Sequence, residues 1–84
     1  MNLQDEILTI AQEECGEFVQ IVSKVRRFGL DNNVQKLAQE AGDVLCMLEL
    51  MVENNIVTQE DLNLAKSLKR EKLKTWSNIF KNNE

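Results

Sequence analysis

Residues 3–28, LQDEILTIAQEECGEFVQIVSKVRRF, form the stretch that decides the fold. Their apolar side chains recur every three or four positions, which at about 100° per residue places them on one face of an α-helix. Asn2 stands before the stretch as a candidate N-cap, and Gly29 after it suits the left-handed residue that ends a helix. The pattern therefore predicts a first helix over residues 3–28.

Two more helices are expected after the first. Residues 31–33 suit a connector, and an apolar helical pattern then covers residues 34–54. Thr58 and Asp61 have the spacing of a capping box, which predicts a third helix over about residues 59–80. The sequence thus predicts three main helices and no sheet.

The composition agrees with an all-α fold. The 84 residues include no proline and three glycines, and 43% of them are hydrophobic, which suits long helices. We expect a single domain over residues 1–84. A chain this short buries little of its surface alone. We therefore expect it to assemble with further copies, as a dimer or tetramer, into a helical bundle. Five apolar residues on the first two helices are the predicted interface: Leu8, Val19, Val22, Leu45 and Val52.

Charge and cysteine content exclude several classes of function. The net charge of −4 argues against a nucleic-acid partner, which is itself negatively charged. No signal-peptide or membrane-spanning pattern is visible, so we expect a cytoplasmic protein with no membrane partner. Cys15 and Cys46 have no CxxC partner and are expected to be buried, reduced thiols.

Acidic residues interrupt the apolar face of the first helix. Glu14 lies at the centre of that face, and Glu17 lies one turn further on. An ionised carboxylate that leaves water normally protonates, pairs with a cation or binds a metal. A cation is therefore expected opposite Glu14.

The second helix carries a similar pair, Glu40 and Asp43, at a spacing that lets both carboxylates grip one ion. Hard oxygen ligands favour Mg²⁺, with Mn²⁺ as the alternative. Each acidic pair encloses a glycine, Gly16 or Gly42. Because glycine costs about 1 kcal/mol inside a helix, we expect the two helices to approach closely there.

The third helix has a lysine where its apolar face should be. Lys69 lies at the centre of this face, Lys72 lies at its margin, and Trp76 either stacks on a base or packs in the core. Either a phosphate or a site carboxylate explains Lys69. The chain has no histidine, which excludes an iron-carboxylate bundle built on Glu-x-x-His, and hydrolysis would use metal-activated water.

The strings EECGEF (residues 13–18) and EAGDVL (residues 40–45) resemble the ExxE and ExxD motifs of the MazG-like nucleoside triphosphate pyrophosphohydrolases, an all-α family. Between the two acidic pairs lie 22 residues, a spacing compatible with that family. The resemblance implies hydrolysis of ribo- or deoxyribonucleoside triphosphates to the monophosphate and pyrophosphate in a homo-oligomer. It implies four Mg²⁺ ligands that are also catalytic residues, Glu14, Glu17, Glu40 and Asp43. It further implies a catalytic and substrate-binding Lys69, with Lys72 as a second phosphate contact. Trp76 is the candidate substrate contact that would stack on the base.

A different class of function remains open. The chain can instead be a non-enzymatic acidic module for oligomerisation, or an adaptor, in which Glu14 pairs with Lys69 in a buried salt bridge. Added metal would stabilise the enzyme and leave such a module unaffected.

Overall fold

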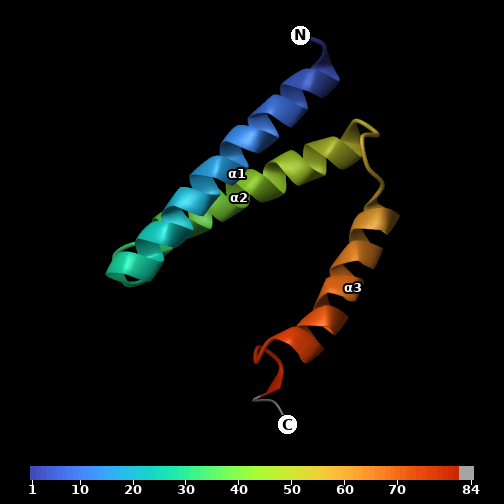
Figure 1. Ribbon diagram of the computed structural model, residues 1–84. Coiled ribbons are helices and arrows are strands. Elements are labelled where there is room, and N and C mark those ends of the chain that lie inside the picture. The colour runs from blue at the N-terminus through green and yellow to red at the C-terminus, as the bar shows by residue number, and fades with distance from the viewer. Residues whose placement is uncertain (82–84) are drawn as a thin grey trace.

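A computed structural model describes residues 1–81, which contain three α-helices and no strand. The helices are α1 (Leu3–Phe28), α2 (Val34–Glu53) and α3 (Gln59–Trp76) (Figure 1). The all-α prediction is confirmed for this part of the chain. The predicted bounds hold for α1, and α2 ends one residue earlier than predicted.

Local hydrogen bonds explain where α1 begins and ends. The Asn2 side chain accepts a bond of 2.8 Å from the Asp5 backbone N–H, as predicted for the N-cap. Gly29 has a φ of 95° and donates its N–H to the Val25 carbonyl at 2.8 Å. A residue with a side chain would be strained at that φ, so glycine stops the helix there. Asn33 then donates its side-chain amide to the Gly29 carbonyl at 2.9 Å, which ties the turn into α2 together.

The helices α1 and α2 form an antiparallel hairpin with a small core. Ile7, Ala11 and Met47 are its buried centre, and they lie toward the open end of the hairpin, away from the turn. Ile10, Leu50, Met51 and Ile56 pack around them, half-buried. No side chain in residues 1–81 is completely buried, so this core stabilises the hairpin only modestly.

The third helix stands away from the hairpin (Figure 1). Within the described residues, α1 and α2 make the only extensive contact between helices, and α3 has no buried residue. The radius of gyration is 15.5 Å. A compact domain of this length has a radius of about 12 Å. The single chain is therefore open rather than a closed three-helix bundle.

The end of α3 differs from the prediction. The helix ends at Trp76 rather than Phe80, because Ser77 is extended, with φ −142° and ψ 173°. Its backbone N–H and its hydroxyl both donate to the Leu73 carbonyl, at 3.0 and 2.8 Å. A serine side chain that competes for backbone groups in this way commonly ends a helix. The chain then turns back, and the Arg70 guanidinium lies 5.0 Å from the centre of the Phe80 ring.

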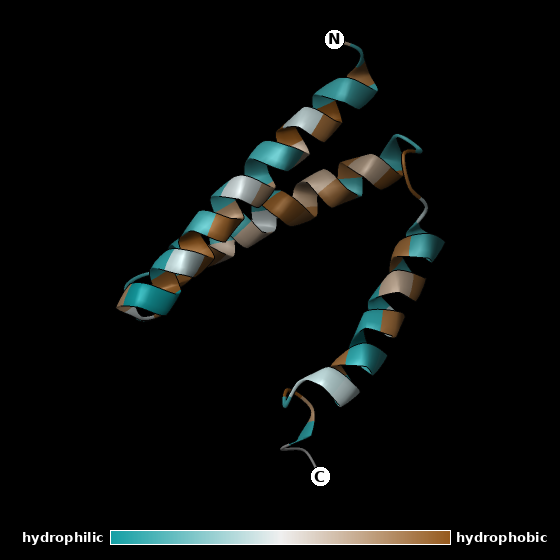
Figure 2. Ribbon diagram, in the orientation of Figure 1, coloured by the Kyte–Doolittle hydropathy of each residue, from teal (hydrophilic) through white to brown (hydrophobic). Residues whose placement is uncertain are grey.

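A large apolar surface stays uncovered. Hydrophobic residues, brown in Figure 2, occur on all three helices. Leu8, Val19 and Leu45 are exposed, as expected for interface residues, whereas Val22 and Val52 are half-buried. The chain exposes 6920 Å². A compact monomer of 9.7 kDa exposes about 5100 Å². For all this apolar surface, no helix of residues 1–81 is long and apolar enough to span a bilayer.

The prediction that both cysteines are buried is wrong for the single chain. Cys15 and Cys46 are free thiols, and both are exposed. Each lies on an outer face of the hairpin, because its neighbour Glu14 or Met47 takes the inner face. Cys15 belongs to an apolar groove of about 500 Å³, which is lined by Leu8, Ala11, Gln12, Cys15 and Met51.

Candidate functional site

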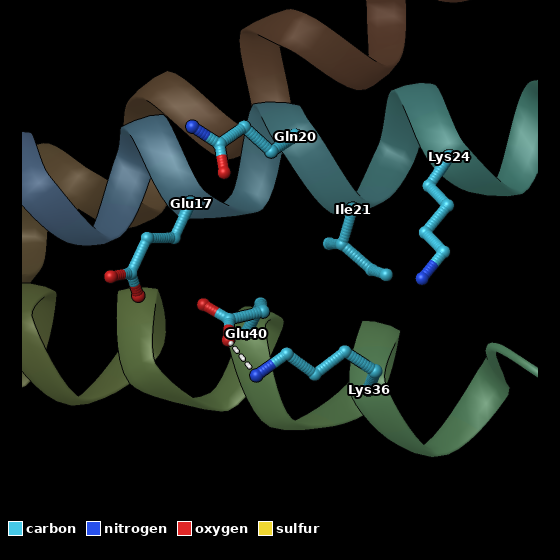
Figure 3. A pocket seen from close by; sticks show the side chains of 6 residues that line it. All are labelled: Glu17, Gln20, Ile21, Lys24, Lys36 and Glu40. Atoms are coloured by element: carbon cyan, nitrogen blue, oxygen red, sulfur yellow. Dashed lines mark ion pairs between the residues drawn. The ribbon is translucent and has the colours of Figure 1, made fainter.

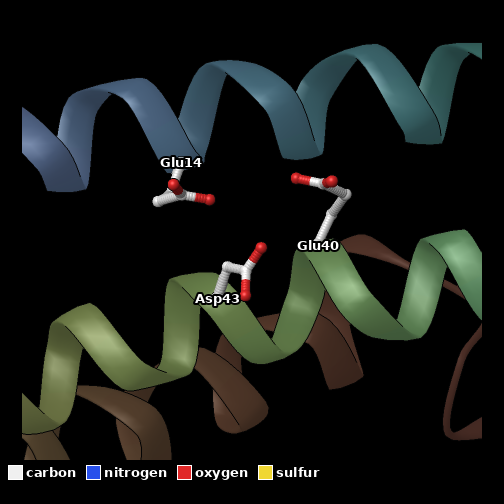
Figure 4. A group of neighbouring side chains, drawn as sticks. All are labelled: Glu14, Glu40 and Asp43. Atoms are coloured by element: carbon white, nitrogen blue, oxygen red, sulfur yellow. The ribbon is translucent and has the colours of Figure 1, made fainter.

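Three of the four predicted metal ligands come together between the helices of the hairpin. Glu14 projects from the middle of α1, while Glu40 and Asp43 project toward it from α2 (Figure 4). One carboxylate oxygen of each residue lies within 4.8 Å of those of the other two. The i, i+3 spacing brings Glu40 and Asp43 to one side of α2, and the antiparallel pairing supplies Glu14 from across the hairpin. We call these three residues the acid cluster.

Burial within the acid cluster is unusual for charged side chains. Glu40 is 3% exposed and is the only buried charged residue of the described chain, while Glu14 and Asp43 are half-buried. The Oε2 atoms of Glu14 and Glu40 are buried without a hydrogen-bond partner. Leaving a buried acceptor unpaired costs roughly 1–3 kcal/mol, and more for a charged group. Two such atoms, aimed into one site from different helices, fit an oxygen-ligated divalent cation.

Repulsion within the acid cluster changes the acidity of Glu14. Partial burial raises the pKa of this carboxyl above its ordinary value, and the negative charges of Glu17, Asp43 and Glu40 raise it further. The carboxylates therefore repel one another in the chain without metal, and a cation would relieve that repulsion.

The cation that faces the acid cluster is Lys36, a residue that the sequence analysis missed. Its Nζ lies 3.0 Å from Oε1 of Glu40. Its hydrogen bond to Glu40 and the charge of that residue are the main causes that raise the pKa of Lys36. The i, i+4 spacing of Lys36 and Glu40 was the signal that could have identified the pair. The counter-charge thus comes from α2 itself and pairs with Glu40 rather than with Glu14.

The fourth predicted ligand, Glu17, lies outside the acid cluster. It is exposed on α1, one turn beyond Glu14, and faces a pocket of about 330 Å³ beside the cluster. Six residues line this pocket: Glu17, Gln20, Ile21, Lys24, Lys36 and Glu40 (Figure 3). Glu17 can therefore reach a ligand in the pocket, although it is not one of the three gathered carboxylates.

The predicted residues of α3 are not brought to the acid cluster. Lys69, Lys72 and Trp76 are all exposed, and α3 does not pack on the hairpin. Trp76 is 82% exposed, so it is not a core residue in the single chain. The predicted salt bridge between Glu14 and Lys69 is absent from residues 1–81, in which the two ion pairs are Lys36–Glu40 and Lys74–Glu71.

The close approach expected at the two glycines is also absent. A Cβ atom built on Gly16 or Gly42 would meet nothing within 4 Å. Gly16 follows Glu14 by two positions, which is about 200° around the helix. Because Glu14 faces α2, Gly16 must face away from it, and Gly42 likewise lies on an exposed face.

Comparisons of the chain with family models, with curated proteins and with solved structures give no match.

Proposed function

We propose that the chain is a Mg²⁺-dependent nucleoside triphosphate pyrophosphohydrolase. It would hydrolyse a ribo- or deoxyribonucleoside triphosphate between the α and β phosphorus atoms, with water as the nucleophile. The observation that carries the proposal is the acid cluster, with carboxylate oxygens from two helices within 4.8 Å and two buried oxygens that have no partner. The resemblance of the ExxE and ExxD strings to the MazG-like family supports the class of reaction.

The ligands of the cation would be Glu14, Glu40 and Asp43, with Glu17 available from the rim of the adjacent pocket. Mg²⁺ usually keeps several of its waters and takes a few carboxylates, so this donor set suits it, and Mn²⁺ can replace it. A bound cation would neutralise phosphate charge and lower the pKa of a bound water. The chain contributes position, since Glu40 is buried between the two helices and projects from α2 toward α1 (Figure 4).

The enzyme would act as a homo-oligomer, either dimer or tetramer. The chain exposes about 1800 Å² more than a compact monomer of its mass, and its apolar side chains are exposed on all three helices. Obligate homodimers commonly bury about 2000 Å² or more in total, and the surplus of two chains exceeds that. A second copy would cover the outer face of the hairpin and the apolar side of α3.

Assembly would also give the residues of α3 their proposed roles. In the single chain Lys69, Lys72 and Trp76 have no site to act on, because α3 stands away from the acid cluster. If α3 of one copy lay against the hairpin of another, the lysines would face phosphate and Trp76 a base. The two free thiols agree with the reducing cytoplasm, where we expect the enzyme to act.

A non-enzymatic adaptor or oligomerisation module is the alternative, and one observation favours it. Lys36 already neutralises Glu40 without any metal, as a structural ion pair would. Such a module would pair α3 with other copies through its apolar face and would not depend on Mg²⁺. A rise in melting temperature on addition of Mn²⁺ or Mg²⁺ favours the enzyme, because a ligand stabilises the folded state to which it binds.

A panel of ribo- and deoxyribonucleoside triphosphates, assayed for pyrophosphate release with and without Mg²⁺, tests the proposed activity. We expect Mg²⁺-dependent release from at least one nucleotide. Asp43→Asn should lower kcat/KM by at least about a hundredfold while keeping the helical content, since it removes a ligand charge at nearly constant volume. Asp31→Asn, in the turn between α1 and α2, is the matched control. No release from any nucleotide, or near-wild-type turnover by Asp43→Asn, would contradict the proposal.

A further inference from the structure

The pocket beside the acid cluster has two ends of opposite charge. Glu17 lies at its acidic end and Lys24 at its basic end, while the Lys36 ammonium lies between them, 3.0 Å from Oε1 of Glu40 (Figure 3). Its volume of about 330 Å³ lies within the range of small-molecule sites. A ligand that pairs with both the acidic and the basic side chains of this pocket must carry a cation as well as negative charge.

The positions of the two lysines follow from helix geometry. Glu17 and Lys24 are seven residues apart, which is two turns, so they share a face of α1 about 10 Å from each other along the axis. Lys36 lies one turn before Glu40 on α2. Both lysines therefore lie on the side of the acid cluster that faces the turn between the helices, one on each wall of the groove.

The pair between Lys36 and Glu40 would change when a cation binds. The Glu40 carboxylate can pair with Lys36 or bind a divalent ion, and it attracts the divalent ion more strongly because that ion carries the greater charge. The Lys36 side chain is 56% exposed, so it can swing away from Glu40 at little cost. Lys36 and Lys24 would then offer two ammonium groups beside a bound dication, and lysine is a common phosphate ligand.

We propose that Lys24 and Lys36 form the subsite for the phosphate chain of a metal-bound polyphosphate. This inference rests on the proposed function, in which the chain belongs to the triphosphate substrate or to the pyrophosphate product. The phosphates would run along the hairpin groove from the acid cluster toward the turn. Phosphate contacts on the hairpin would then be complete within one chain, whereas those predicted for Lys69 and Lys72 need a second copy.

Calorimetry on the intact chain tests the subsite with inorganic pyrophosphate as the probe. Mn²⁺ is titrated alone, and pyrophosphate is then titrated at saturating Mg²⁺. We expect Lys24→Met and Lys36→Met each to weaken pyrophosphate binding by at least about tenfold. Mn²⁺ affinity should be unchanged in Lys24→Met and higher in Lys36→Met, because Glu40 loses a competing cation.

Arg26→Met is the matched control. Arg26 lies two residues after Lys24 on α1, but it lines a separate surface hollow with Val19, Val22, Ser23 and Arg27. The control makes the same change of charge and should alter neither affinity. All three side chains are exposed, and circular dichroism with a melting curve checks that each variant folds.

Three results would overturn the subsite. The first is that the wild type does not bind pyrophosphate. The second is that both lysine variants bind pyrophosphate within about twofold of the wild-type affinity. The third is that Arg26→Met loses as much pyrophosphate affinity as the lysine variants. The nucleotide assay separates this inference from the proposed function. If the wild type hydrolyses a nucleotide while both lysine variants bind pyrophosphate as tightly as the wild type, the subsite alone is rejected. Lysine-dependent pyrophosphate binding without any turnover rejects the hydrolase and keeps the subsite.

Discussion

Glu40 is the residue on which the site depends. It is 3% exposed, and its two oxygens differ, since Oε1 pairs with Lys36 while Oε2 is buried and unpartnered. Leaving a buried acceptor without a partner costs free energy in the folded chain. A cation shared with Glu14 and Asp43, as proposed above, would satisfy that oxygen.

Replacing Glu14 by glutamine should stabilise the metal-free protein at neutral pH. The pKa of Glu14 is raised in the folded state, so the ionised carboxylate destabilises the fold at every pH above that raised pKa. This destabilisation declines as the pH falls through the folded pKa and vanishes below the ordinary pKa of glutamate. Melting curves in a chelator should therefore show a higher melting temperature for Glu14→Gln at pH 7 and no advantage at low pH.

Glu13→Gln is the control for this pH dependence, because Glu13 is the exposed neighbour on the outer side of α1. It should leave the melting temperature nearly unchanged. A lower melting temperature for Glu14→Gln than for wild type at pH 7 would contradict the repulsion described for the acid cluster.

At the residue scale, sequence spacing predicted the acid cluster better than it predicted its counter-charge. The i, i+3 pair of Glu40 and Asp43 and the central position of Glu14 needed only helix periodicity. Lys36 was missed because an exposed lysine at i, i+4 from a glutamate is common on any helix surface. What distinguishes it is the burial of Glu40, and burial depends on how α1 packs on α2.

At the element scale, the glycines in the acidic motifs offer a test of the helix faces. Gly16 and Gly42 face open space within helices, so Gly16→Ala and Gly42→Ala should each raise the free energy of unfolding by about 0.5–1 kcal/mol through helix propensity. Urea unfolding measures the change. A loss of stability in either variant would contradict the open space around that glycine and would indicate that a second copy is in close contact with it.

The role of α3 is tested by Lys69→Met, which keeps the apolar stem and removes the charge. If assembly brings Lys69 to the phosphates, kcat should fall by about one to three orders of magnitude, or roughly 1.4–4 kcal/mol. Mn²⁺ affinity should stay unchanged, because the lysine that pairs with the acid cluster within the chain is Lys36 rather than Lys69. Steady-state kinetics and calorimetry measure the two effects.

Lys66→Met, earlier on the same helix, controls for loss of charge on α3 and should change neither quantity. If Lys69→Met instead bound metal more strongly and lost stability without metal, Lys69 would be the counter-charge of the acids. Unchanged values in both measurements would show that Lys69 only extends into solvent.

The helix ends were predictable where a single capping residue decides them, as at Asn2, Gly29 and Thr58. The end of α3 was not, because the apolar pattern continues to Phe80 while the Ser77 side chain takes the Leu73 carbonyl. Periodicity describes which face of a helix is apolar, and it does not reveal a side chain that competes for the backbone.

At the scale of the whole molecule, the open shape predicts self-association. Sedimentation at micromolar concentration should show at least a dimer, because the exposed apolar surface of the single chain would otherwise stay in water. Leu45→Glu, which places a charge on the exposed side of α2, should shift the equilibrium toward smaller species. A compact, stable monomer for the wild type would contradict this prediction.

The open shape itself was beyond the reach of sequence reasoning. The apolar face of α3, centred on Lys69, indicates that this face is covered, but the pattern contains no information about which surface covers it. Neither α1 nor α2 does so in the single chain. The number and order of the helices were predicted correctly, although α3 ends at Trp76 rather than Phe80. Their packing depends on contacts between distant segments.

The central claim is that the acid cluster binds a divalent cation, and calorimetric titration with Mn²⁺ tests it most directly. We expect saturable binding by the wild type and a loss of at least about tenfold in affinity for Asp43→Asn, with Asp31→Asn unchanged. At a Mn²⁺ concentration about a hundred times the Kd, the folded state should gain about 2.7 kcal/mol and melt at a higher temperature. No saturable binding by the wild type, or equal affinities in Asp43→Asn and wild type, would contradict the account.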